Sequence, residues 1–382
     1  MAWPRVRLGE VLRRVERFEA RDELTEYQFA GTYSFARGIF VGQRKLGSTF
    51  ALPKIQRIHQ GDFIYCKIMA WEGAFGIAPK EVDRCVMSGA FVAYELNRDR
   101  IDQEFLDYFF KVPAHWQAIG NQSSGTNVRR QSLHPTQFER AEIPLPPLAE
   151  QRRIVARIEA LAAKIAETRS LRQLEEQEIR TMQRGAFVRI AKHALRRPMS
   201  EVAPLIRRPV EIEMEGSYPE LGIRSFGNGT FHKAALSGFE LGSKRVFWIE
   251  PGDLLFSNVF AWEGAIAVAK PEDRGRVGSH RFITCAPRKD VTTSQFLRFY
   301  FLTDEGMDLI RAASPGGAGR NRTLGLAALD AIEVPVPPIE DQLWFDNLQA
   351  KVDALKRLQG ETATELDAML PAILDRAFRG KL

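Results

Sequence analysis

The chain has 382 residues, of which 45% are hydrophobic and 27% charged, and its formal net charge of +6 permits nucleic-acid binding without establishing it. Its three cysteines, an odd number without CxxC spacing, argue against a disulfide framework or a structural zinc site. No apolar run has the length of a membrane span or of a secretory signal core, so we expect a cytoplasmic protein.

The first part of the chain predicts a compact α/β domain. An opening stretch, Val6–Arg17, suits a strand or a short helix, and the aromatic-rich run from Gly61 to Gly73 suits strands. The segment Ile101–Val112 has its aromatic residues at helical spacing, which predicts an amphipathic helix. A Gly/Ser-rich loop at Gln122–Thr126 follows, and then an extended segment.

Two adjacent prolines, Pro146 and Pro147, introduce a long predicted helix. A residue before proline is forced out of the helical region, whereas the second proline can occupy the first helical position. Glu150 then lies in the first turn, where the helix dipole favours an acid. Apolar residues recur at a spacing of three and four along about 40 residues, which is about 60 Å of helix. The predicted seam includes Ile154, Ile158, Leu161 and Ile165.

The second half of the chain repeats the first at an offset of 191 residues, which is half of the chain length. The pentapeptide AWEGA at Ala70–Ala74 recurs at Ala261–Ala265, and Gln151 recurs as Gln342. Two longer segments recur with changes, GTYSFARGIF as GIRSFGNGTF and SSGTNVRRQSL as SPGGAGRNRTL. The proline pair recurs as well, so the chain is a tandem duplication.

The duplication predicts the architecture. The second helix has its own apolar seam, with Leu348, Val352, Leu355, Leu366 and Met369. Neither helix can bury its seam alone, so we expect them to pack on each other. Two equivalent units associate most readily about a pseudo-twofold axis, which makes the helices antiparallel and carries a globular domain to each end of a rigid spacer.

The predicted fold class is therefore α/β, with two tandem-duplicated α/β domains joined by two long antiparallel coiled-coil helices. The predicted domain boundaries are 1–145, 146–192, 193–336 and 337–382, in which globular domains and helices alternate.

Catalytic residues are not repeated. An enzyme duplicated in this way would carry its acid, base or nucleophile in both halves, yet no histidine or cysteine has a like residue at the offset. The phosphate-binding, dinucleotide-binding, zinc-protease and serine-hydrolase motifs are missing too. The sequence predicts a non-catalytic protein without a cofactor or metal of its own, and a site in one half alone stays open. The recurring acids Asp62/Asp253 and Glu72/Glu263 are interpreted as structural.

Residues that differ between the halves are free to discriminate between ligands. Lys67 and Asn258 occupy equivalent predicted strand positions, where lysine suits a guanine edge and asparagine an adenine edge. A solvated strand face is the alternative interpretation. Other candidates in or beside divergent segments are Arg44, Lys45, His232, Lys233, Lys244 and Arg245.

The arginines that follow the Gly/Ser loops are further candidates for DNA contact. Arg129 and Arg130 in one half, and Arg320 and Arg322 in the other, lie at matching places after a glycine-rich loop. Such a loop with two arginines suits phosphate contact or groove entry, and ordinary surface arginines are the alternative.

The sequence resembles a known family. The segment EIPLPPLAEQRRIVARIEAL with its degenerate second copy, GDLLFSNVFAWEGAIAVA and the pre-helix GRNRTL are typical of the specificity subunits of type I restriction-modification systems. The resemblance covers the whole chain. It departs from the family pattern at the second helix start, where EDQLWFDNLQAKVDALKRL replaces the basic AEQRRIVARIEALAAKI.

The resemblance implies two target-recognition domains that each read one half of a bipartite DNA site, and helices that set the gap between the halves. It implies two methyltransferase subunits as partners, which methylate adenine with S-adenosylmethionine, and two restriction subunits that use ATP. Those cofactors, with Mg, would belong to the partners. A stand-alone DNA-binding regulator with the same fold, acting without methyltransferase partners, is the alternative.

Overall fold

The structure is a computed structural model that describes residues 3–123, 131–316 and 322–382. In these ranges no helix combines the length and the apolar character that a membrane crossing requires. All three cysteines are buried and free.

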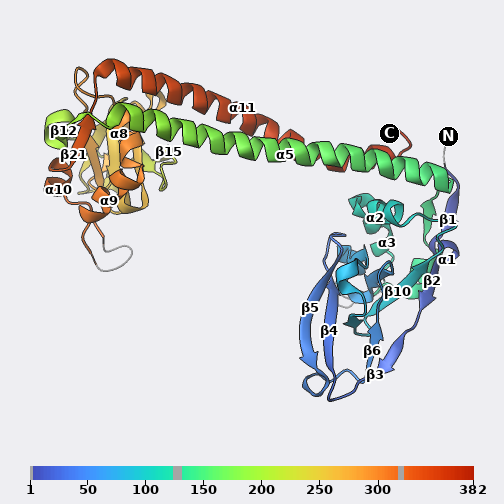
Figure 1. Cartoon of the computed structure of the whole chain (residues 1–382). Coiled ribbons are helices and arrows are strands. Elements are labelled where there is room, and N and C mark those ends of the chain that lie inside the picture. The colour runs from blue at the N-terminus through green and yellow to red at the C-terminus, as the bar shows by residue number, and fades with distance from the viewer. Residues whose placement is uncertain (1–2, 124–130, 317–321) are drawn as a thin grey trace. The chain divides into compact units, whose positions relative to one another are not determined.

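The chain forms two compact units. Unit 1 consists of Met1–Arg172 with Gly360–Leu382, and unit 2 consists of Gln173–Gln359. Two long helices, α5 (Leu148–Ala191) and α11 (Ile339–Phe378), each contribute to both units (Figure 1). The predicted long helices are therefore present.

Unit 1 has a four-stranded sheet and a five-stranded sheet. The four-stranded sheet has the order β2-β10-β7-β8, and the five-stranded sheet has the order β3-β6-β9-β4-β5, in which only the β4–β9 pair is parallel. A short ladder between β1 and β11 brings the start of the unit to the residues before the prolines. The strands are β1 (Arg5–Arg7), β2 (Leu12–Val15), β3 (Phe18–Ala20), β4 (Glu26–Thr32), β5 (Ile39–Leu46), β6 (Lys54–Arg57), β7 (Phe63–Cys66), β8 (Phe75–Ile77), β9 (Val86–Met87), β10 (Phe91–Leu96) and β11 (Glu142–Pro144). The helical segments are α1 (Leu8–Val11), the 3₁₀ turns η1 (Gly47–Thr49), η2 (Lys67–Glu72) and η3 (Lys80–Val82), α2 (Gln103–Lys111), α3 (Pro113–Gly120) and α4 (Pro135–Arg140).

Unit 2 repeats this plan. Its sheets have the orders β13-β20-β17-β18 and β15-β14-β19-β16, and a ladder between β12 and β21 again joins the two ends of the globular part. The strands are β12 (Leu195–Pro198), β13 (Leu205–Ile206), β14 (Ser217–Ile223), β15 (Thr230–Ser237), β16 (Val246–Ile249), β17 (Leu254–Ser257), β18 (Ile266–Val268), β19 (Arg276–Ser279), β20 (Phe282–Cys285) and β21 (Glu333–Val336). The helical segments are α6 (Met199–Val202), α7 (Gly238–Leu241), the 3₁₀ turns η5 (Ala261–Glu263) and η6 (Pro271–Asp273), α8 (Ser294–Phe301), α9 (Asp304–Ala312) and α10 (Leu326–Asp330).

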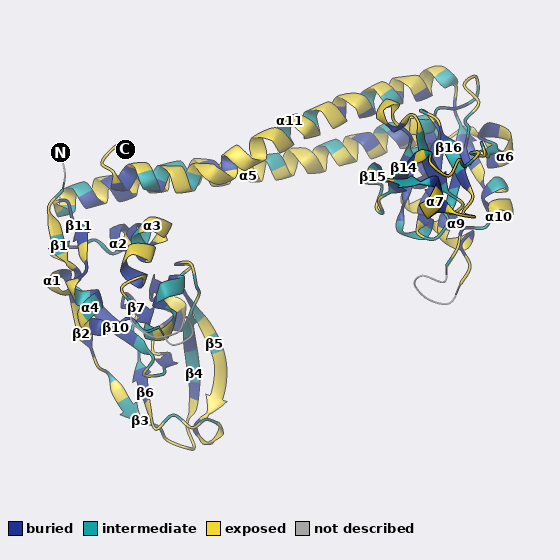
Figure 2. Cartoon of the chain, turned by 180° about the vertical axis from the view of Figure 1, so that it is seen from behind, coloured by how far each residue is buried: buried dark blue, intermediate teal, exposed yellow. Residues whose placement is uncertain are grey.

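The predicted amphipathic helices α2 and α8 cover the four-stranded sheets. The α2 side chains Phe105, Leu106, Phe109 and Phe110 are buried, two adjacent pairs one turn apart, as a single apolar face requires. Each helix starts at a capping side chain. The backbone N–H of the third helical residue donates to Asp102 Oδ1 in α2 and to the equivalent threonine Oγ1 in α8, at 3.1 Å in both. Figure 2 shows the buried residues gathered in these layers.

The long helices pack on their globular parts as well as on each other. In unit 1, Ile154 and Ile158 of α5 share a core with Leu374, Ala377 and Phe378 of α11 and with α2. The helices α5 and α11 run antiparallel within each unit. In unit 1, Arg169 contacts Asp367 and Arg172 contacts Thr362, and in unit 2, Glu175 contacts Gln359 and Phe187 contacts Phe345. Buried positions among the proposed seam residues are Ile154, Ile158, Ile165, Val352 and Leu366, whereas Leu161, Leu348 and Leu355 are half-buried.

Three expectations for the helices are wrong. Met369 is 47% exposed. The residue after Leu366 that faces the core is Leu370, four residues further on, and not Met369, three residues further on. The seam is interrupted as well, since none of residues 166–182 is buried. Finally, α5 starts at Leu148. Pro147 lies one position before the helix, and its carbonyl accepts the first intrahelical bond, from the Gln151 N–H at 3.0 Å.

Candidate nucleic-acid interface

A partly buried ion pair recurs in both units and explains the repeated aspartates. Arg17 Nη1 lies 2.6 Å from Asp62 Oδ2, and Arg208 Nη1 lies 2.6 Å from Asp253 Oδ2. Each carboxylate also accepts a backbone N–H three residues earlier, at 2.8 and 2.9 Å. The two aspartates therefore fix a turn to the opening segment, which is a structural role.

A buried glutamine anchors each long helix to its globular part. Gln151 and Gln342 are both fully buried, and each donates through Nε2 to the carbonyl of the first proline of its pair, at 2.8 Å. The Oε1 atom accepts the backbone N–H of the capping residue, Asp102 in unit 1 at 2.8 Å and Thr293 in unit 2 at 3.1 Å. The helix start and the capped helix are thus held by one side chain in both copies.

The AWEGA pentapeptide forms a tight 3₁₀ turn at the end of the central strand in each unit. Gly73 and Gly264 end the turn in the left-handed conformation, with φ of 77° and 76°, where glycine carries no Cβ penalty. The tryptophan Nε1 donates back to a backbone carbonyl three residues earlier, at 3.1 Å in unit 1 and 2.9 Å in unit 2. These contacts account for the exact recurrence of the motif.

The tip of a β-hairpin is fixed onto this turn in both units. The backbone N–H of Phe35 donates to Glu72 O at 2.7 Å, and that of Phe226 donates to Glu263 O at 2.9 Å. The serine before each phenylalanine donates to the same glutamate's Oε2, at 2.9 and 3.2 Å. The repeated glutamates therefore position the tip of the β4–β5 hairpin and of the β14–β15 hairpin.

This fixation presents a phenylalanine to solvent. Phe35 and Phe226 have φ of 63° and 60°, a left-handed conformation that is uncommon for a bulky residue. Their side chains are nevertheless exposed, Phe35 at 62% and Phe226 at 79%. The same unusual backbone and the same exposed ring thus occur at one place in both units.

The surroundings of this tip differ between the units. In unit 1, Trp116 packs edge-on against Phe35, with ring centroids 6.2 Å apart, and covers Gly73. In unit 2 the equivalent residue is Met307, and a cavity of about 520 Å³ is lined by it and by Phe226. Arg322 also lines this cavity, with its guanidinium carbon 5.3 Å from the Trp262 ring centroid.

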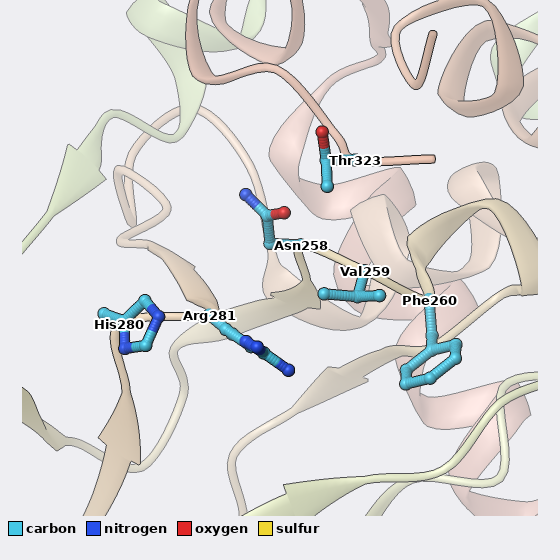
Figure 3. A pocket seen from close by; sticks show the side chains of 6 residues that line it. All are labelled: Asn258, Val259, Phe260, His280, Arg281 and Thr323. Carbon is cyan, nitrogen blue, oxygen red and sulfur yellow. The ribbon is translucent and has the colours of Figure 1, made fainter. Parts of the chain in front are cut away.

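A second cavity in unit 2, of about 530 Å³, lies at the start of the same turn (Figure 3). Asn258 donates through Nδ2 to Leu324 O at 3.3 Å, so its Oδ1 can still accept a hydrogen bond. His280 and Arg281 border the cavity from the end of β19, and both are exposed. The lining consists of Asn258, Val259, Phe260, His280, Arg281 and Thr323.

Every lining residue of this second cavity differs from its counterpart in unit 1. The six counterparts at the offset are Lys67, Ile68, Met69, Gly89, Ala90 and Ser132. The AWEGA turn beside the cavity is unchanged, so a common backbone supports two chemically different surfaces. His280 and Arg281 were not among the candidates from the sequence. The signal that could have identified them is that they differ from the residues 191 positions earlier although the neighbouring AWEGA motif is unchanged.

The structure separates the other candidates. It brings Asn258 and Arg322 to the two cavities beside the AWEGA turn. Arg44 and Lys45 lie toward the other end of β5, roughly 15–20 Å along the strand from the hairpin tip. Lys233 lies within β15, and Lys244 with Arg245 precede β16. Arg129, Arg130 and Arg320 lie outside the described residues.

One expectation for the candidate residues needs correction. Lys67 and Asn258 do not lie on strands, because β7 ends at Cys66 and β17 at Ser257, where the chain enters the tight turn. His232 Nε2 lies 2.9 Å from Asp273 Oδ1, a buried carboxylate, and His232 stays a candidate for DNA contact. Among the residues that the structure describes, no three His, Cys, Asp or Glu side chains form a possible metal site.

Known proteins of one kind resemble this chain. Residues 2–176 match the family described as "Type I restriction modification DNA specificity domain". The type I restriction enzyme StySPI specificity subunit of Salmonella potsdam is 21% identical, and the EcoKI specificity subunit of Escherichia coli K12 is 20% identical. Each alignment covers 77% of this chain and 68% of the relative.

Solved structures share the fold over the whole chain. The HsdS subunit from Thermoanaerobacter tengcongensis has a TM-score of 0.65 at 23% identity, with 100% of this chain and 97% of that chain covered. A chain from a study of complex assembly and conformational transition of the type I R-M system has a TM-score of 0.71 at 24% identity, covering 100% and 98%. Residues 2–176 therefore carry a type I restriction-modification DNA specificity domain, and the chain is similar over most of its length to type I restriction enzyme specificity subunits.

Proposed function

We propose that this chain is the non-catalytic DNA-recognition subunit of a type I restriction-modification complex, in which each unit reads one half of a bipartite site. The observation that carries the proposal is the pairing of identical turns with different cavity walls. The AWEGA turn and its hairpin tip are held by the same hydrogen bonds in both units, while all six residues around the second cavity differ. A duplicated reader of two different sequences requires this combination.

The chemistry of unit 2 suits a DNA duplex. Asn258 and Arg281 offer the amide and guanidinium groups that pair with adenine and guanine edges in the major groove. Arg322, which is half-buried on Trp262, supplies a positive charge for a phosphate beside them. In unit 1 the place of Asn258 is taken by Lys67, so a different base would be read there.

The helices support the proposed partners. Two methyltransferase subunits would dock on them, and two restriction subunits would complete the assembly. S-adenosylmethionine, ATP and Mg would be bound by those partners. The start of α11 exposes Leu343 at 55% and Trp344 at 46%, whereas the equivalent positions of α5 carry Arg152 and Arg153. We therefore expect unequal contacts with the two methyltransferase subunits. A cytoplasmic location stays a prediction.

The test is co-expression with the methyltransferase encoded beside this chain, followed by mapping of methylated adenines across the host genome. The proposal predicts one sequence with two defined parts separated by a fixed number of unspecified bases. A single undivided sequence, or no methylation despite a stable complex, would refute it. A chain that binds DNA but no methyltransferase would instead indicate the stand-alone regulator.

The spacing role of the helices has its own test. Inserting one helical turn after Arg169 in α5, with a matching turn in α11 beside its partner Asp367, should change the number of unspecified bases and leave both defined parts unchanged. The mapped spacing is the readout, and an unaltered spacing would contradict the role of the helices as a ruler.

A further inference from the structure

We propose that Phe35 and Phe226 insert their rings against the bases of the DNA, one in each half-site, as the contact that both units share. This inference rests on the proposed function and names two residues that act in it. Neither ring is needed to bury a core, since both are largely exposed at 62% and 79%.

The left-handed backbone conformation of Phe35 and Phe226 lowers the stability of the folded protein. A phenylalanine at φ near 60° is strained, and such strain persists only where neighbouring contacts over-determine it. Here the contacts are two consecutive backbone hydrogen bonds in each unit. They run from Phe35 and Ala36 to the turn at Glu72 and Gly73 in unit 1, and from the equivalent residues in unit 2, all at 2.7–2.9 Å.

A glycine at these positions would relieve the strain, and the next position in the chain shows that a glycine is accepted in this turn. The residue after the phenylalanine is also left-handed in both units, and it is Ala36 in unit 1 but Gly227 in unit 2. The phenylalanine itself is present in both copies. A large ring that costs stability and buries little in the free protein implies a ligand that covers it.

The charges around the rings point to DNA as that ligand. The Arg37 guanidinium carbon lies 5.4 Å from the Tyr33 ring centroid and 6.0 Å from that of Phe35. In unit 2, Arg311 and Arg322 line the cavity beside Phe226. An apolar ring flanked by arginines suits a base stack bordered by phosphates better than an apolar protein surface.

Base contact also explains why this residue is shared. Stacking on a base is tolerant of sequence, because every base has a π-face, and a phenylalanine wedge can partly unstack a base step. The same residue can therefore serve two half-sites that the differing cavity walls distinguish.

The experiment compares Phe35→Gly and Phe226→Gly with the wild-type chain, each assembled with its methyltransferase subunits. The probes are duplexes containing the mapped site, with 2-aminopurine placed in turn at each step of one half-site. Each substitution should weaken binding roughly tenfold. It should also remove the 2-aminopurine fluorescence rise in its own half-site only. The salt dependence should stay unchanged, because no charge is lost.

Stability and a matched residue provide the controls. Because glycine relieves the left-handed strain, the melting temperature of Phe226→Gly should be no lower than that of the wild type. Phe239→Ala is the matched variant, since Phe239 is 75% exposed in the same unit but its counterpart is Ser48. It should bind like the wild type. Phe226→Trp should retain binding.

Several results would overturn the inference. These are unchanged binding in both glycine variants, equal weakening of both half-sites by either one, or loss of methyltransferase co-purification, which would make the rings a protein-docking contact. A wild-type complex that binds no DNA would defeat the proposed function itself, and the inference with it.

Discussion

The two units share the contacts that fix the backbone and differ in the side chains that line the surface. The ion pair of Asp62 recurs at Asp253, and the glutamine anchor and the hairpin-tip hydrogen bonds recur with distances that agree to within a few tenths of an ångström. At the cavity beside the AWEGA turn, by contrast, all six positions have changed. Duplication has kept a scaffold and left the side chains around this cavity free to diverge.

A second difference lies on the long helices. Val155 of α5 is buried in the core of unit 1, and its counterpart in α11 is Asp346. Within the described residues, Asp346 Oδ1 has no hydrogen-bond partner, and burial raises the pKa of this carboxyl to about 6. Unit 2 therefore carries a charge at a place that unit 1 fills with an apolar side chain.

The largest expected effect comes from removing the arginine–aspartate ion pair that both units contain. Asp253→Ala should destabilise unit 2 by about 3 kcal/mol, because the partly buried Arg208 and a backbone N–H lose their partner. Asp62→Ala should destabilise unit 1 by no more than this, because Arg17 keeps Glu95 as a second partner at 2.7 Å. Chemical unfolding would measure both. Asp99→Ala and Asp290→Ala, the exposed recurring pair, are the controls and should change stability by less than about 0.5 kcal/mol. A larger loss of stability in Asp62→Ala than in Asp253→Ala, or no loss in either, would break the comparison.

Replacing Asp346 with the residue of the other unit should sharpen the comparison. Asp346→Val should stabilise unit 2 by about 1–2 kcal/mol at pH 7.5, after allowance for solvent screening, because the charged carboxylate is disfavoured there. The folded pKa is raised, so wild-type stability should rise as the pH falls through about 6, and the advantage of the variant should shrink toward pH 4.

Unfolding curves at several pH values would check this sign. Asp346→Asn, which removes the charge alone, is the control and should give part of the gain. A variant that is less stable than the wild type at pH 7.5 would contradict the account of Asp346.

The smallest effect concerns one phosphate contact. Arg322→Ala should weaken DNA binding a few-fold and lower the slope of log K against log salt by about 1, because one cation beside the duplex is lost. Arg197→Ala changes the net charge equally but removes an arginine paired with Glu201, and it should leave the slope unchanged. Equal slopes for both variants would remove Arg322 from the interface. Salt titrations of the assembled complex provide the measurement.

Much of the scaffold could be predicted because it depends on local sequence. The long helices follow from the proline pairs and the apolar spacing, and α2 and α8 follow from their aromatic periodicity. Because the chain is duplicated, each of these elements could be predicted independently in both halves. The predicted seam was wrong at Met369, because the buried position after Leu366 lies four residues further along the helix and not three. Whether the step is three or four residues depends on packing against a distant part of the chain.

The candidate site was harder to predict because its parts come from separate segments. His280 and Arg281 lie beyond the end of β19, about 20 residues from Asn258 in sequence, and only the strand pairing brings them together. Lys67 and Asn258 were expected on strands because the preceding residues alternate well, yet the AWEGA turn starts at once. His232 could not be recognised as paired, since Asp273 lies in a different element.

The central claim is that each unit reads one half-site. The most direct test replaces residues of unit 2 that line the second cavity and differ from their counterparts in unit 1. A chain with Asn258→Lys, His280→Gly and Arg281→Ala takes three residues of unit 1 into unit 2. Methylated adenines would be mapped for this chain and for the wild type, each with the same methyltransferase. We predict that one defined part of the site is relaxed or altered while the other part and the spacing are unchanged. Alteration of both parts, or of neither, would contradict the account.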